Sequence, residues 1–142
     1  MAAPRSILTH SDNRSKWNAG ASAIPNGSAV KQGAGDDAIT IATASNDVVL
    51  GLLTGGDLER GAVRSGPYLD VQIRNLAIGI AGTGGVTRGD RLTVDPAKPG
   101  RLIKAQPSTG TTVTIVGVAN RTASDGERFE VELAGPGASL TG

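Results

Sequence analysis

Histidine and paired carboxylates are the side chains of this chain that could do chemistry. His10 is the only imidazole, and it lies in a polar stretch with no strand pattern around it. A Ser-His-Asp arrangement needs a base held in position, and a zinc site needs several ligands. We therefore expect neither catalysis nor metal binding at His10.

The paired carboxylates also have positions that favour other roles. Asp36 and Asp37 lie in a segment typical of a turn. Glu130 and Glu132 alternate with apolar residues, which places both on the solvent face of a strand. The chain contains no cysteine, so thiolate metal sites and disulfides are excluded. We expect no catalytic residue, no metal site and no cofactor.

The glycine-rich segment 82–90 is not a phosphate-binding loop. A P-loop needs Lys followed by Ser or Thr after its last glycine, and then a helix, whereas this segment leads into a strand pattern. It contains an integrin-type Arg-Gly-Asp at 88–90, and the chain has three glycosylation patterns. Such short motifs often arise by chance, and a protein that is not exported meets neither the integrin nor the glycosylation enzyme that would recognise them.

The elements that would position any site are short β runs separated by glycine-containing turns. This spacing predicts an all-β fold, a small antiparallel β-barrel or sandwich with an extended N-terminal arm. The predicted strands cover residues 38–42, 48–53, 68–73, 76–80, 91–94, 101–105, 112–119 and 129–133.

A strand-turn-strand module occurs twice along the chain. Residues 49–53 lead to 70–73, and residues 115–119 lead to 130–133. In each copy the first strand is apolar with a single glycine, and the second strand alternates. Two hairpins can look alike by chance, but the shared glycine position and exit pattern favour an internal repeat.

Composition limits the remaining classes of function. The 142 residues fit one domain, and with three aromatic residues its core must consist of small aliphatic side chains. No apolar run reaches the length of a membrane span, and the N-terminus lacks a signal-like apolar stretch. We expect a soluble protein that is not exported. The net charge of +1 is too small to favour nucleic-acid binding.

The predicted organisation is an N-terminal arm over 1–28, a β-barrel over 29–135 and a short C-terminal tail over 136–142. The first 35 residues carry a net charge of +3, and the remainder carries −2. Ordering an arm costs about 1 to 2 kcal/mol per residue, so we expect another protein surface to hold it.

Five residues of the arm are predicted to contact that surface. Trp17 is the expected anchor, because aromatic side chains dominate interface hot spots. A lone tryptophan packed onto its own barrel is the alternative. The predicted contact residues are Ile7, Leu8, Arg14, Lys16 and Trp17.

About 60% of the chain resembles the capsid decoration proteins of tailed bacteriophages, also called head-stabilising or cement proteins. Members typically read G-x-V-x-x-G-D-x-L-x-x-D, then a G-V-A strand and a terminal V-x-V-x-L. The arm here is longer than in the smallest members, and the turn at 98–100 departs from the usual Asp-Gly or Asn-Gly. The matching segments are VVLGLL at 48–53, DVQI at 70–73, GVTRGDRLTVD at 85–95, IVGVA at 115–119 and residues 126–133.

This resemblance implies a structural virion protein rather than an enzyme. Such proteins assemble, usually as homotrimers, on the outer surface of the capsid, where they bridge major capsid protein subunits. The implied partners are the major capsid protein and further copies of the chain, with no nucleic acid, membrane or small-molecule substrate. The protein would be made in the host cytoplasm and located on the virion. A carbohydrate or host-surface binding β module is the alternative, and an enzyme built on a β trimer is a third reading.

Overall fold

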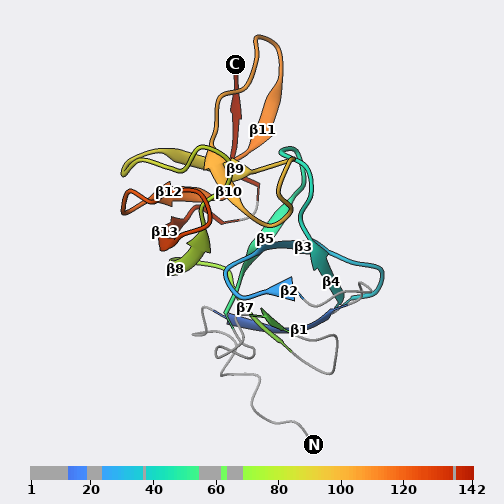
Figure 1. The fold of residues 1–142 in the computed structure, drawn as a ribbon. Coiled ribbons are helices and arrows are strands. Elements are labelled where there is room, and N and C mark those ends of the chain that lie inside the picture. The colour runs from blue at the N-terminus through green and yellow to red at the C-terminus, as the bar shows by residue number, and fades with distance from the viewer. Residues whose placement is uncertain (1–12, 19–23, 37, 55–61, 64–68, 136) are drawn as a thin grey trace, which may run out of the picture.

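The computed structural model describes residues 13–18, 24–36, 38–54, 62–63, 69–135 and 137–142, with only the backbone at 13–18, 62–63 and 69–70. The described residues form strands and no helix, which confirms the predicted all-β class. Consequently, no helix in these ranges could cross a membrane. The strands make two five-stranded units joined end to end (Figure 1).

The first unit is a closed barrel with strand order β1-β4-β3-β5-β7. Neighbouring strands are antiparallel except β1 and β4, which are parallel. Part of the predicted arm therefore forms a strand of this barrel. The strands are β1 (Asn13–Asn18), β3 (Ala29–Gln32), β4 (Ala38–Ile41), β5 (Val49–Leu53) and β7 (Leu69–Gln72).

The second unit is a five-stranded sheet with order β10-β9-β12-β13-β8. All its neighbouring strands are antiparallel. The predicted run 112–119 is split, because the chain leaves a separate two-stranded ladder at residue 114 before it enters this sheet. The strands are β8 (Asn75–Ile80), β9 (Arg91–Val94), β10 (Leu102–Lys104), β12 (Gly117–Ala119) and β13 (Arg128–Leu133).

The two units repeat the same strand pairing. In the first, Val30 of β3 lies opposite Gly51 of β5; in the second, Leu92 of β9 lies opposite Gly117 of β12. The order β1-β7-β5-β3-β4 thus corresponds to β8-β13-β12-β9-β10. The internal repeat predicted from the two glycines is confirmed, and it extends to all five strands.

Both units also close at the same place. In the first barrel, Asn18 pairs in parallel with Ile39. In the second, Ala81 forms a parallel bridge with Leu102, and the Gly82 N–H donates a hydrogen bond to the Leu102 carbonyl at 2.7 Å. The second sheet therefore curls until its two end strands meet, as in the first barrel.

The matching glycines are needed because each strand approaches its neighbour closely. A Cβ on Gly51 would overlap the Gln72 carbonyl oxygen, and a Cβ on Gly117 would overlap the Glu132 carbonyl oxygen. Neither contact can be relieved by rotating a side chain, because both involve backbone atoms.

One apolar core joins the two barrels. The interior of the second barrel contains Leu102 and Val131, and four residues of the first barrel belong to the same cluster: Ala29, Ala42, Val49 and Leu52. Leu52 reaches strand β8, since its Cδ1 lies 3.5 Å from where a Cβ on Gly79 would sit. The first barrel has its own smaller interior cluster of Ile24, Val30, Ile39, Leu53 and Val71.

A buried carboxylate fixes the turn where the second barrel closes. Asp95 is 2% exposed. Its Oδ2 accepts hydrogen bonds from the N–H and the hydroxyl of Thr83, both at 2.8 Å, and its Oδ1 accepts one from the Ala97 N–H at 2.9 Å. Burial alone would raise the pKa of Asp95, but these hydrogen bonds outweigh it and hold the pKa below its ordinary value of 3.8.

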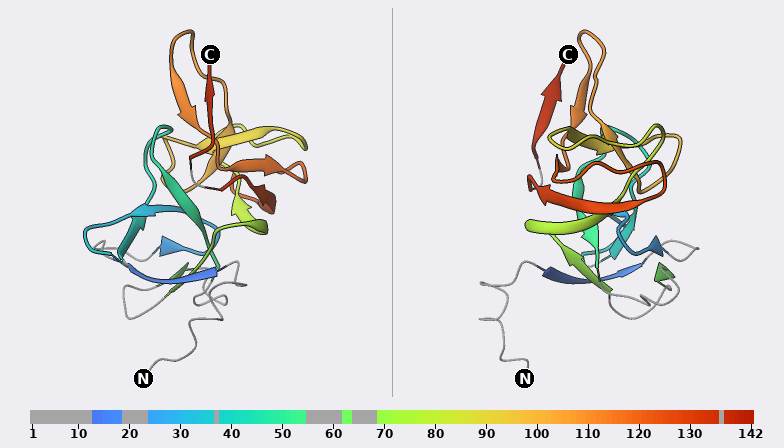
Figure 2. Two further views of the ribbon diagram at one scale, coloured as in Figure 1. Left: turned by 180° about the vertical axis from the view of Figure 1, so that it is seen from behind. Right: turned by 60° about the vertical axis from the view of Figure 1, so that its left-hand side comes forward.

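Two short ladders complete the fold. Strand β2 (Ile24–Pro25) pairs with β6 (Ala62–Val63), and β11 (Thr112–Thr114) pairs with β14 (Ser139–Thr141). The predicted C-terminal tail thus contains a strand. The β11 ladder projects from the end of the molecule opposite β1 (Figures 1 and 2).

Replacing Gly117 with alanine should destabilise the protein by at least about 2 kcal/mol, because the new Cβ forces β12 away from β13. Chemical denaturation measures the loss. Val48→Ala, at a side chain that is 61% exposed, is the control and should change the free energy of unfolding by less than about 0.5 kcal/mol. A Gly117→Ala protein as stable as the wild type would contradict the close approach.

The Asp95→Asn variant should be less stable than the wild type at pH 7 by about 1 to 3 kcal/mol. Because the folded pKa of Asp95 lies below its unfolded value, its contribution is present above pH 3.8 and is lost as pH falls through the folded pKa. The two unfolding free energies should therefore converge below pH 3.8. Asp36→Asn, at an exposed carboxylate that forms no ion pair with another described residue, is the control. A gap at pH 7 no larger than the control's would refute the role of Asp95.

Candidate interaction surface

The predicted contact residues fall in two groups. Arg14, Lys16 and Trp17 lie on β1, opposite Val71, Leu69 and Ala38 respectively. Ile7 and Leu8 lie outside the described residues. The structure thus brings three of the five onto one strand at one end of the molecule, and their role in contacts stays a prediction (Figure 1).

A second surface, which the sequence did not single out, is the outward side of β8, β12 and β13. We call it the outer face, and it consists of Leu76, Ile78, Val118, Glu130 and Glu132. Leu76 and Val118 both lie opposite Glu132, and Ile78 lies opposite Glu130. The apolar members are 50%, 45% and 37% exposed for Leu76, Ile78 and Val118. The predicted outward orientation of both glutamates is confirmed.

Strand β8 buries its small residues and exposes its large apolar ones, the reverse of the usual preference. Its inward residues are Ala77 and Gly79, which are buried, whereas Leu76 and Ile78 point outward. An isolated sheet gains more by burying the larger side chains. Small residues are needed inside because Leu52, Leu102 and Val131 already occupy the space next to Gly79. Exposed large residues grouped on one face are typical of an interaction surface.

The charges around the outer face are only partly neutralised within the chain. Arg121 Nε lies 3.1 Å from Glu130 Oε1. Arg128 donates a hydrogen bond to the Asn26 carbonyl at 3.2 Å. Arg91 and Glu132 form no ion pair with any other residue in the described ranges, and both are exposed.

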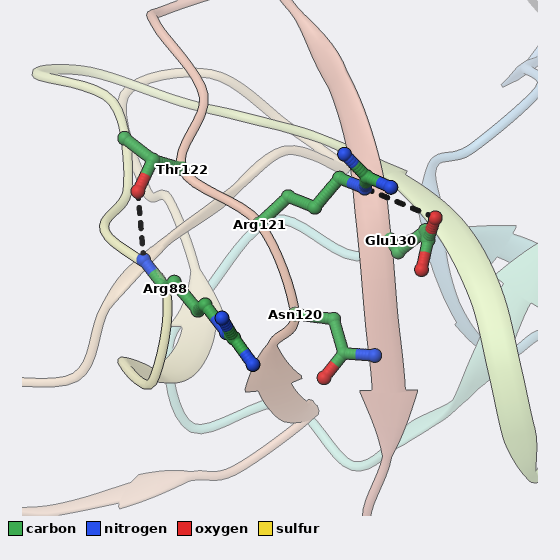
Figure 3. Close-up of a pocket in the computed structure, with 5 residues that line it drawn as sticks. All are labelled: Arg88, Asn120, Arg121, Thr122 and Glu130. Atoms are coloured by element: carbon green, nitrogen blue, oxygen red, sulfur yellow. Dashed lines mark hydrogen bonds and ion pairs between the residues drawn. The ribbon is translucent and has the colours of Figure 1, made fainter.

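A polar hollow of about 460 Å³ flanks the outer face beyond β12 (Figure 3). The Arg88 N–H donates to Thr122 Oγ1 at 3.1 Å, while the Arg88 guanidinium extends toward Asn120. The hollow is lined by Arg88, Asn120, Arg121, Thr122 and Glu130.

The Arg-Gly-Asp motif has its acid turned into its own loop. Asp90 Oδ2 accepts a hydrogen bond from the Thr87 N–H at 2.9 Å, and Oδ1 lies 3.9 Å from Lys104 Nζ. The Asp90 side chain is only 14% exposed. This carboxylate therefore stabilises a turn, in keeping with a chance occurrence of the motif.

A smaller, mainly apolar hollow of about 290 Å³ flanks the other side of the outer face, where the two barrels meet. Asn26 is 5% exposed, and its Nδ2 and Oδ1 have no hydrogen-bond partner in the described part of the chain. The hollow is lined by Asn26, Gly27, Leu53, Thr54, Ile78 and Arg128.

The described residues contain no group of three or more His, Cys, Asp or Glu side chains that could hold a metal ion. The absence of a catalytic residue and of a cofactor stays a prediction from the sequence. What the described surface offers is contact area of mixed apolar and charged character.

Comparison with solved structures gives several similar chains. No protein-family model matches the chain, and a search of curated proteins found no match. One similar structure is the head fiber gp8.5 N base of bacteriophage phi29, with 20% sequence identity, coverage of 86% of this chain and 92% of that chain, and a TM-score of 0.60. The fold of this chain is therefore similar to that of the base of a phage head fiber.

Proposed function

We propose that this chain is a structural protein of a phage head, which binds the outer surface of the capsid. The observation that carries the proposal is the agreement of two separate likenesses. The sequence motifs at 48–133 resemble capsid decoration proteins, and the fold is similar to a phage head fiber base. Both likenesses lead to the exterior of a phage head.

The more specific role is stabilisation of the shell. The chain bridges major capsid protein subunits as a homotrimer, without enzymatic activity, and is located on the virion surface. Simultaneous attachment by several copies makes modest contacts sum to tight retention. The residues assigned to these contacts are Ile7, Leu8, Arg14, Lys16 and Trp17.

The shape of the molecule supports an orientation on the shell. Strand β1, with three of the assigned residues, lies at one end, and the β11 ladder lies at the other (Figure 2). We assign the β1 end to the shell and the β11 end to the outside. The shared core keeps the two ends at a fixed separation.

Replacing Ile7 and Leu8 together with serine should weaken binding to heads that lack this protein by at least about tenfold per site, because two apolar contacts are lost. Co-sedimentation of the full chain with such heads measures binding. The substitutions lie before β1 and should leave the thermal unfolding midpoint unchanged.

The matched control replaces the flanking Ser6 and Thr9 with alanine and should bind like the wild type. If the Ile7→Ser/Leu8→Ser protein binds as well as this control, the assigned contact residues are wrong. If the wild type itself does not bind the heads, the capsid-binding role is wrong.

A further inference from the structure

The surface by which the first barrel docks onto the second has a counterpart on the second barrel. In the first barrel, Leu52 lies opposite Ala29 on one side, and in the second, Val118 lies opposite Arg91. Ala29 and Leu52 are fully buried in the shared core. Their counterparts are exposed. One position of the repeated fold thus joins two barrels in the first copy and is left open in the second.

The open position is the centre of a larger apolar group. Val118 on β12 shares the outer face with Leu76 and Ile78 on β8, and β13 between them contributes Glu130 and Glu132. Leu76 and Ile78 are exposed because the second barrel admits only small residues beneath them. The face therefore has both the position and the composition of a barrel-docking surface.

The charges on either side of Val118 are arranged so that the face complements itself. Arg91 and Glu132 both lie opposite Val118, on the two neighbouring strands, so they are each one strand spacing from it, about 4.8 Å. Neither is paired with another described residue. A two-fold axis that runs parallel to β12 and passes between the Val118 side chains of two facing copies would bring Arg91 of each copy to Glu132 of the other, as isologous contacts require.

We propose that a second copy of this chain docks on the outer face, with Val118 of the two copies in contact at a two-fold axis. The apolar side chains supply the buried area, and the two Arg91–Glu132 pairs set the orientation of the copies. In a trimer on a shell, this contact joins chains of neighbouring trimers. Only the joining of neighbouring trimers on a shell rests on the proposed function. The contact between two copies does not, because self-association needs no capsid.

Single charge reversals should break the contact, and the double reversal should restore it. Arg91→Glu alone and Glu132→Arg alone each place like charges opposite one another, so we expect the dissociation constant for self-association to rise at least about tenfold. The Arg91→Glu/Glu132→Arg double variant recreates the pairs and should return to within about threefold of the wild type. Sedimentation equilibrium without capsids measures the association.

Val118→Glu should abolish the pairing through the outer face and leave any trimer intact, and Val48→Glu is its matched control. Val48 is 61% exposed and lies before β5, away from the outer face, so its substitution should have no effect. Far-UV circular dichroism verifies that each variant is folded.

The proposal is overturned if wild-type units, whether monomers or trimers, do not associate in pairs, if Val118→Glu behaves like Val48→Glu, or if the double reversal does not recover. Head binding is measured separately. Loss of head binding with intact self-association overturns the capsid-binding role alone, and intact head binding by a wild type whose units do not pair overturns only this proposal.

Discussion

The structure depends on the insertion of the first barrel's outer surface into the second barrel's interior. Leu52, on the outside of its own barrel, packs among Leu102 and Val131, next to Gly79. A five-stranded barrel of about 60 residues buries only about 60% of the surface of its unfolded chain, so its stability alone is marginal. The shared core supplies the missing burial, and it makes the two barrels one cooperative unit with a fixed relative orientation.

This arrangement has two consequences for function. A rigid body with β1 at one end and the β11 ladder at the other is suited to stand on a surface and to hold its far end at a set distance (Figure 1). The duplication also leaves one docking position unfilled, because the described residues form two barrels and leave Val118 exposed. Our two proposals therefore assign attachment to the β1 end and association to the outer face, which are different parts of the chain.

The sequence alone predicted the all-β class, the strand at 91–94 and the repeat marked by Gly51 and Gly117. These follow from local alternation and turn chemistry. It did not predict β1, because Asn13–Asn18 is polar and acquires its partners from β7 and β4, far along the chain. It also could not give the outer face. A run such as 76–80 does not reveal which side is buried, and the pairing of Val118 with its charged neighbours depends on a register that only the folded sheet defines.

The most direct measurement is a cryo-electron microscopy reconstruction of phage heads saturated with the protein. We expect density for both barrels on the outer surface of the shell, with the β1 end against the capsid and the β11 ladder pointing away from it. Heads without added density, or density with the β11 end against the shell, would contradict the central claim that the double barrel stands on the capsid by its N-terminal end.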